Sequence, residues 1–226
     1  MINGKKVLAF VPARIGSKRI INKNLKELNN IPLFMHSVNV ARKSQYIDDI
    51  LVSSDSKAIL KIAHANGCIK NNIRPSEYSQ DNSRIIDGIL YELKELKQKY
   101  DILILLQPTS PYRTKELVDG ALEEYVKKNT SLITVVESIE QPIFMRSIVN
   151  NELQKIITDS SDKRSQDFSN YYTIVGSIYI NNIKDLNSSI ILNENKIPFI
   201  IDRKYAIDID TEIEFEEAKK IMENLD

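Results

Sequence analysis

Short apolar runs alternate with helical patterns along most of this 226-residue chain. Residues 7–11 are apolar throughout, and residues 101–106 form the most apolar run, as expected for strands buried on both faces. Helical patterns follow, over 32–42 after the first run and over 57–66 after a strand at 49–55, where Gly67 would end the helix. This order predicts an α/β fold with parallel strands joined by right-handed crossovers.

The same reading extends to the rest of the chain. Further strands are predicted over 132–137, 175–180 and 198–201, and further helices over 84–99, 114–128 and 211–225. From about residue 140 to residue 171 the chain becomes polar and loses the strand–helix rhythm. Because repeats and linkers are absent from the sequence, we expect one domain over 1–226 with an arm at about 140–171 inserted within it.

Composition narrows the classes of partner. The 31 basic and 31 acidic residues cancel, so no nucleic-acid partner is expected. The single cysteine, Cys68, excludes an internal disulfide and fits a reducing compartment. No stretch approaches the roughly 20 apolar residues that span a bilayer, and Pro12 and Arg14 interrupt the first apolar run before it could serve as a signal peptide. We therefore expect a cytoplasmic protein with no membrane partner.

A basic loop follows the first predicted strand. It carries four cations, Arg14, Lys18, Arg19 and Lys23, around the small turn 16–17. Positive charge and backbone N–H groups at the carboxyl end of a strand are how α/β proteins hold phosphate. The loop matches neither the P-loop nor the Rossmann fingerprint, so the charge here comes mainly from side chains. The alternative is a solvated basic loop with no ligand.

Two further loops are candidates for ligand contacts. Residues 107–113, Q-P-T-S-P-Y-R, follow the predicted strand 101–106 and would lie at the same edge of the sheet. Residues 74–83, R-P-S-E-Y-S-Q-D-N-S, precede the predicted helix 84–99. The alternatives are a turn-rich connector for the first loop and a helix cap from Asp81 or Ser83 for the second.

Paired carboxylates occur near the end of the sequence. In an extended chain Asp208 and Asp210 point to the same side, where like charges favour a shared cation such as Mg²⁺. The alternative is that Asp210 only caps the following helix, with Thr211 and Glu214 spaced as a capping box. The two histidines of the chain lie in no motif, so covalent nucleophilic catalysis is not expected.

Five motifs, at 14–24, 74–83, 107–113, 176–179 and 208–211, together resemble those of the acylneuraminate cytidylyltransferases, or CMP-sialic acid synthetases. That family includes the legionaminic and pseudaminic acid enzymes. The resemblance implies a three-layer, Rossmann-like α/β fold of the nucleotide-diphospho-sugar transferase type, with a mixed, mostly parallel sheet. It implies a reaction in which CTP and a nonulosonic (sialic-type) acid give the CMP-sugar and pyrophosphate, for bacterial surface glycan synthesis.

The resemblance also implies roles for particular residues. Catalytic roles fall to Arg14, Lys18, Asp208, Asp210 and Arg164, and Mg²⁺ is held by Asp208 and Asp210. The nucleotide is bound by Arg14, Lys18, Lys23, Asn24, Arg74 and Ser83, and the sugar by Gln107, Thr109 and Tyr179. For Tyr179 the alternative is a packing role in a buried strand.

The arm is implied to join a homodimer and to lend Arg164 to the partner's site. Family members usually have an R-Q-D run there, which Ser165 interrupts in this chain, and a solvated charged loop is the alternative. Two other functions stay open: a nucleotidyltransferase for another acid sugar such as Kdo, and a non-catalytic nucleotide-sugar-binding relative. The second would be expected to have lost Arg14, Lys18, Asp208 or Asp210, and all of these are present.

Overall fold

The computed structural model describes residues 1–157 and 170–223. Within these residues a central six-stranded sheet has the order β10-β6-β9-β5-β1-β4. Its strands are β1 (Val7–Pro12), β4 (Asp49–Ser53), β5 (Ile102–Leu106), β6 (Leu132–Glu137), β9 (Tyr172–Asn182) and β10 (Ile197–Ile200). β9 is antiparallel to its neighbours β5 and β6, whereas β1 pairs in parallel with β4 and β5, and β6 with β10. The predicted α/β fold with a mixed, mostly parallel sheet is confirmed.

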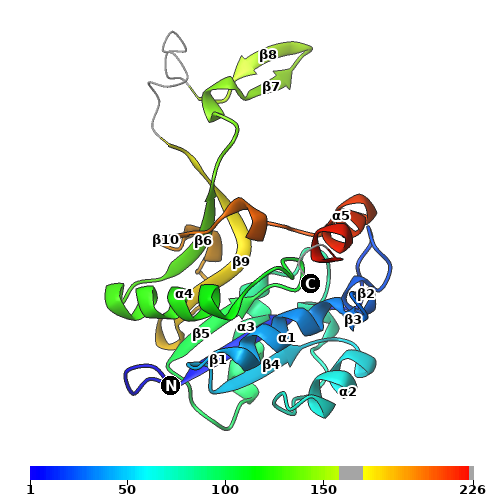
Figure 1. Ribbon diagram of the computed structural model, residues 1–226, viewed down its shortest axis with the longest axis vertical. Helices are drawn as coiled ribbons and strands as arrows, with labels where there is room; N and C mark the ends of the chain where they lie inside the picture. The colour runs from blue at the N-terminus through cyan, green and yellow to red at the C-terminus, as the bar shows by residue number, and fades with distance from the viewer. Residues whose placement is uncertain (158–169, 224–226) are drawn as a thin grey trace.

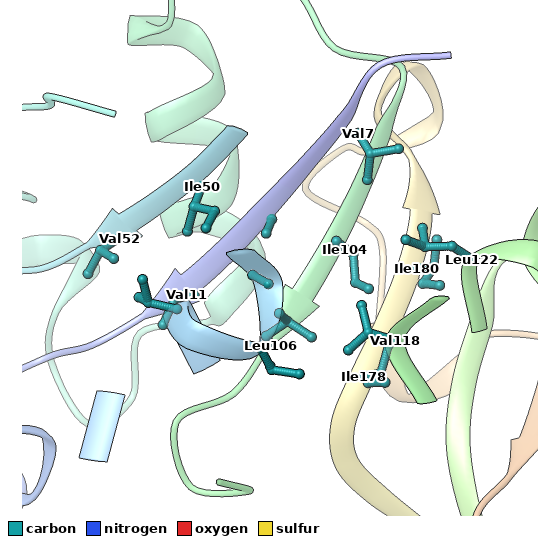
Figure 2. Close-up of a cluster of buried hydrophobic side chains, with 14 of the residues drawn as sticks. Val7, Val11, Ile50, Val52, Ile104, Leu106, Val118, Leu122, Ile178 and Ile180 are labelled. Carbon is teal, nitrogen blue, oxygen red and sulfur yellow. The ribbon is translucent and has the colours of Figure 1, made fainter. Parts of the chain in front are cut away.

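Helices cover both faces of the sheet, which gives three layers (Figure 1). Helices α1 (Leu33–Lys43), α2 (Lys57–Ala65) and α4 (Lys115–Lys128) pack their apolar sides on one face. Figure 2 shows this core, where Val118 and Leu122 of α4 meet strand residues such as Ile178. Helix α3 (Ile85–Glu95) packs Ile89 on the opposite face. Burial of apolar area on both faces is the main stabilising contribution.

The C-terminal ends of helices α2 and α3 can be compared with the ends predicted from the sequence. Gly67 follows α2 with φ +77°, the left-handed conformation that favours glycine at a helix end, as predicted. Helix α3 ends at Glu95 rather than at the predicted 99. The chain becomes extended at the next residue, and Tyr100 is then buried with its hydroxyl donating to Asp49 Oδ2 at 2.8 Å. Packing of this tyrosine therefore outweighs the helical pattern.

A β-hairpin extends from the sheet within the predicted arm. Strand β6 leads to β7 (Arg146–Val149) and β8 (Glu152–Lys155), which pair antiparallel around Asn150 and Asn151, both with positive φ. The hairpin stands away from the body of the molecule in Figure 1. Arg164 and the basic run 163–167 lie outside the described residues. The limits of the domain and of the arm stay predictions.

The C-terminal helix α5 (Glu212–Glu223) lies beside the basic loop. Its Phe215 and Ala218 pack with Ile20, Leu28 and Leu33. Short strands β2 (Glu27–Leu28) and β3 (Ile31–Pro32) complete this region, and 3₁₀ turns occur at Lys23–Leu25, Ser76–Tyr78, Pro142–Phe144, Ile183–Asp185, Leu192–Glu194 and Arg203–Tyr205. Among the described helices, none is long and apolar enough to cross a membrane.

Candidate active site

A cavity of about 630 Å³ opens at the carboxyl ends of β1 and β5, and we call it the main cavity. Its lining comes from the loop after β1, the loop before α3, residues 107–109 and Asp210. A side pocket of about 240 Å³ adjoins it, because Arg84, Ile85 and Gln107 line both. The motifs that are far apart in the sequence thus meet at one edge of the sheet, where ligands of open α/β sheets bind.

The basic loop presents its first two cations to a single carboxylate. Arg14 Nη1 lies 2.8 Å from Asp81 Oδ1, and Lys18 Nζ lies 2.5 Å from Asp81 Oδ2. Hydrogen bonding from Lys18, followed by the charges of Lys18 and Arg14, lowers the pKa of Asp81. A single carboxylate therefore pairs with both cations for which the sequence predicts phosphate binding, and it offsets only one of their two positive charges.

A second carboxylate pairs with the other two cations of the loop. Lys23 is buried and donates from Nζ to the carbonyl of Ile209 at 2.8 Å and to Asp210 Oδ1 at 3.1 Å. Arg19 Nη2 donates to Asp210 Oδ2 at 2.8 Å. Desolvation would raise the pKa of Asp210, but Lys23 and then Arg19 outweigh it, so that the pKa lies below its ordinary value. Asp210 is thus ionised and held at the wall of the main cavity.

Asp208 has a different environment from Asp210. It is exposed, yet the protein around its carboxyl raises its pKa, chiefly by desolvation and further through the negative charge of Asp210, against a hydrogen bond from the Thr109 side chain. The intervening Ile209 is fully buried, and its N–H donates to the carbonyl of Thr109 at 2.7 Å. This anchor fixes the carboxylate pair against the end of β5.

The side chain of Asp210 does not cap helix α5. The N–H of Glu214 donates to Thr211 Oγ1 at 3.3 Å, and Glu214 Oε2 accepts from the N–H of Thr211 at 2.7 Å and of Asp210 at 2.8 Å. Thr211 and Glu214 therefore form the capping box of α5. Because they supply the cap, the Asp210 side chain is directed to Lys23 and Arg19 instead.

Two buried polar side chains form the inner wall of the main cavity. Asn24 donates from Nδ2 to the carbonyl of Arg14 at 2.7 Å, while its buried Oδ1 has no hydrogen-bond partner in the described part of the chain. Arg74 donates from Nε to Ser79 Oγ at 3.0 Å. Desolvation lowers the pKa of Arg74, against the opposing charges of Asp55 and Glu92. Asn24, with its unpaired buried oxygen, and the buried cation Arg74 thus both line a space that a ligand can occupy.

The loop before α3 is organised by Ser83. Its hydroxyl donates to the carbonyl of Glu77 at 2.7 Å and accepts from the N–H of Gln80 at 3.0 Å. Helix α3 begins after Arg84 without a side-chain cap, so the helix-cap alternative for Asp81 or Ser83 is wrong. These two residues instead shape the cavity wall.

Gln107, Thr109 and Tyr179 connect the main cavity to the side pocket. Gln107 lines both spaces, Thr109 lines the main cavity, and Tyr179 lines the side pocket. The Tyr179 hydroxyl donates to Asn193 Oδ1 at 2.9 Å, and desolvation raises its pKa to about 12, so it is neutral at physiological pH. The packing alternative for Tyr179 also holds in part, because the ring is buried among apolar residues.

Sequence reasoning missed several residues of the site. Arg84 donates from Nη2 to the carbonyls of Ser188 at 2.6 Å and Ile190 at 3.1 Å, which closes the side pocket. Glu92 is buried and accepts from Ser53 Oγ at 2.6 Å, close to Arg74. The sequence did hold a signal for Glu92, because it lies three positions after Ile89 and therefore on the apolar side of the predicted helix.

Known proteins match both the sequence and the fold. Residues 8–225 match the family model described as Cytidylyltransferase. A CMP-N,N'-diacetyllegionaminic acid synthase of Legionella pneumophila is 31% identical over 229 residues, covering 96% of this chain and 97% of the relative. A pseudaminic acid cytidylyltransferase of Campylobacter jejuni is 28% identical over 220 residues, covering 95% of each. A solved CMP:2-keto-3-deoxy-manno-octonic acid synthetase complexed with CTP shares the fold, with a TM-score of 0.73 at 17% identity over 97% of this chain and 99% of that one.

Proposed function

The chain belongs to the cytidylyltransferase family, and on that premise we propose that it transfers CMP from CTP to a nonulosonic (sialic-type) acid. The anomeric hydroxyl of the sugar attacks the α-phosphorus of CTP. A new P–O bond forms, the bond to the bridging oxygen breaks, and pyrophosphate leaves with the electron pair. The hydroxyl proton passes to a carboxylate of the site or to solvent. One observation carries the proposal: the four cations of the basic loop and Asp210 of the carboxylate pair line one cavity.

The proposed phosphate contacts depend on exchange of partners. Arg14 and Lys18 release Asp81 and bind the triphosphate, with Lys23 as a further contact. Exposed ion pairs contribute little to stability, so this exchange costs little. In-line displacement at phosphorus needs mainly positioning and neutralisation of charge, and these cations supply both.

The nucleoside contacts follow from the inner wall. Asn24 Oδ1 is a buried acceptor without a partner in the described residues, so a hydroxyl or amino group of CTP can donate to it. Arg74 and Ser83 line the same wall. We assign Gln107, Thr109 and Tyr179 to the acid sugar, since Gln107 lies where the main cavity meets the side pocket.

The carboxylate pair fits a Mg²⁺ site that the substrate completes. Desolvation and then the charge of Asp210 raise the pKa of Asp208, and a cation shared by the two carboxylates would relieve their repulsion. The described residues hold no cluster of three or more His, Cys, Asp or Glu side chains suited to a metal. Mg²⁺ commonly takes one or two carboxylates together with substrate phosphates and water. When bound there it neutralises phosphate charge.

We place the protein in the cytoplasm as a homodimer serving bacterial surface glycan synthesis, with Arg164 of the arm assigned to the partner's site. Ile148 and Leu153 on the hairpin are each 73% exposed, which favours their burial by a second copy. Sedimentation of the double variant Ile148→Asp/Leu153→Asp should show a monomer, and an unchanged dimer would exclude this surface.

The activity is tested by pyrophosphate release from CTP and Mg²⁺ with N-acetylneuraminic, legionaminic, pseudaminic and Kdo acids. Release with a nonulosonic acid supports the proposal. Release with Kdo alone supports the alternative transferase, and CTP binding without release from any acid supports the non-catalytic relative. In the active case Asp208→Ala should abolish turnover with the fold retained, whereas the exposed control Asp185→Ala should not. A normal rate for Asp208→Ala would remove the metal role.

A further inference from the structure

A β-bulge lies in β9 next to the end of β5. The pairing of β6 with β9 shifts register between Ile133 and Val135, so that Thr134 faces several residues of β9. Thr134 Oγ1 donates to the carbonyl of Val175 at 2.7 Å and accepts from the N–H of Ile178 at 3.0 Å. The hydroxyl thus replaces backbone pairing and displaces residues 176–177 from the regular strand.

Arg113 fixes this bulge to the residue that follows β5. It donates from Nη1 to the carbonyl of Ser177 at 2.8 Å and from Nη2 to the carbonyl of Gln107 at 2.9 Å. Arg113 as a whole is 8% exposed, so these bonds are shielded from water. The backbone of Gln107 is therefore held at a constant distance from the bulge.

The side chain of Gln107 lies directly over Gly176. A Cβ atom at position 176 would lie 2.7 Å from Gln107 Oε1 and 3.7 Å from Nε2. Gly176 is not among the glycines with positive φ, so its backbone conformation does not require glycine. Its missing side chain instead leaves the room that the Gln107 carboxamide occupies.

We infer that Gly176 is a positioning residue that orients the Gln107 carboxamide for an acidic substrate. The oxygen of the carboxamide is turned toward Gly176, and the nitrogen, its hydrogen-bond donor, lies farther from the bulge. An acidic sugar presents a carboxylate, which needs donors and is repelled by a carbonyl oxygen. Because Gln107 lines both the main cavity and the side pocket, this orientation determines which group an incoming sugar meets. The inference rests on the proposed function.

The test is Gly176→Ala. The displaced atom is the end of a flexible side chain, so the unfolding midpoint should change little, while KM for the accepted acid sugar should rise about tenfold, equivalent to the loss of about 1.4 kcal/mol. KM for CTP should stay within about twofold. Gly120→Ala is the matched control, because its Cβ would meet only Phe199 at 3.5 Å, an ordinary contact.

A double-mutant cycle separates positioning from a structural effect. If Gly176 acts through Gln107, Gly176→Ala should add nothing to KM in a Gln107→Ala background. An added rise there, or an equal rise for CTP, overturns the inference. If the wild type is inactive on every acid sugar, the proposed function fails, but the Gln107 side-chain amide NMR signal still tests the inference. It should shift in Gly176→Ala and not in Gly120→Ala, and an unmoved signal overturns the positioning role.

Discussion

The cations of the site occupy two opposite environments. At the mouth of the main cavity the side chains of Lys18 and Arg19 are 83% and 64% exposed, and each is paired with a carboxylate. Arg74, in the inner wall of this cavity, and Arg113, behind Gln107, are buried, and within the described residues they form no ion pair. Their hydrogen bonds go to hydroxyls and carbonyls instead. Lys18 and Arg19 thus have charged partners at the surface, and Arg74 and Arg113 have neutral partners inside the protein, while the buried Lys23 lies between the two cases because it pairs with Asp210.

This difference teaches which contacts can be exchanged. An exposed ion pair contributes at most about 1 kcal/mol, so a phosphate can replace its carboxylate. A buried guanidinium loses its hydration when the protein folds, whether or not a ligand then binds in the cavity. Burial lowers the pKa of Arg113 to about 9, which still leaves it charged at neutral pH. We infer that the exposed cations exchange their carboxylates for ligand, that Arg74 contacts the nucleotide from a fixed position in the wall, and that Arg113 holds loops in place.

The largest effect is expected for a buried cation. Arg113→Lys keeps a buried charge but cannot reach the carbonyls of Gln107 and Ser177 together, so it should lower the free energy of unfolding by about 3 kcal/mol. Urea denaturation measures this loss. Arg19→Lys, the same substitution at the mouth, should change the value by under about 0.5 kcal/mol. Equal effects for the two variants would remove the distinction between the environments.

Lys18→Ala, at the mouth of the main cavity, should affect activity and leave stability unchanged. The free energy of unfolding should be unchanged, whereas kcat/KM for CTP should fall about 100-fold because a cation is lost from the developing phosphate charge. The matched control is Lys61→Ala, which removes an exposed lysine of α2 outside the main cavity. A large loss of stability in Lys18→Ala, with kcat/KM retained, would reverse the assignment.

Replacing Asp208 or Asp210 should change the unfolding temperature by smaller amounts and in opposite directions. The pKa of Asp208 is raised in the fold, so ionisation of Asp208 opposes folding as the pH rises through that pKa. Asp208→Asn should therefore raise the unfolding temperature at pH 7 by about 2 °C or less, a gain that disappears near pH 3. The pKa of Asp210 is lowered, so Asp210→Asn should lower the unfolding temperature at pH 7. Calorimetry at both pH values checks the signs.

The smallest effect is expected for Asp81→Asn. Removing the carboxylate that competes for Arg14 and Lys18 should lower KM for CTP by about two- to threefold. Steady-state kinetics at low and high salt measure the change, which should shrink as salt screens exposed charges. A higher KM that persists in high salt would mean that Asp81 orders the cations rather than competing for them.

The buried strands and the loops of the site could be predicted from the sequence. Which strands are neighbours, and which charged side chains pair with one another, could not. Apolar runs identify buried strands, and the loops that follow β1 and β5 must lie at one edge when those strands are parallel. Periodicity does not say which strands are neighbours, so the antiparallel position of β9 and its bulge at Thr134 were not predicted. Asp81 was considered as part of a ligand loop or as a helix cap, but not as a partner of Lys18 and Arg14, because those contacts join distant segments.

The ion pair between Lys23 and Asp210 joins residues 187 positions apart. During translation at about 5 to 20 residues per second, the acid is made about 10 to 40 s after the base. Until Asp210 has been made, the basic loop of a nascent chain therefore lacks the carboxylate that pairs with Arg19 and Lys23 in the folded protein. The basic loop can reach its native charge balance only after Asp210 has left the ribosome.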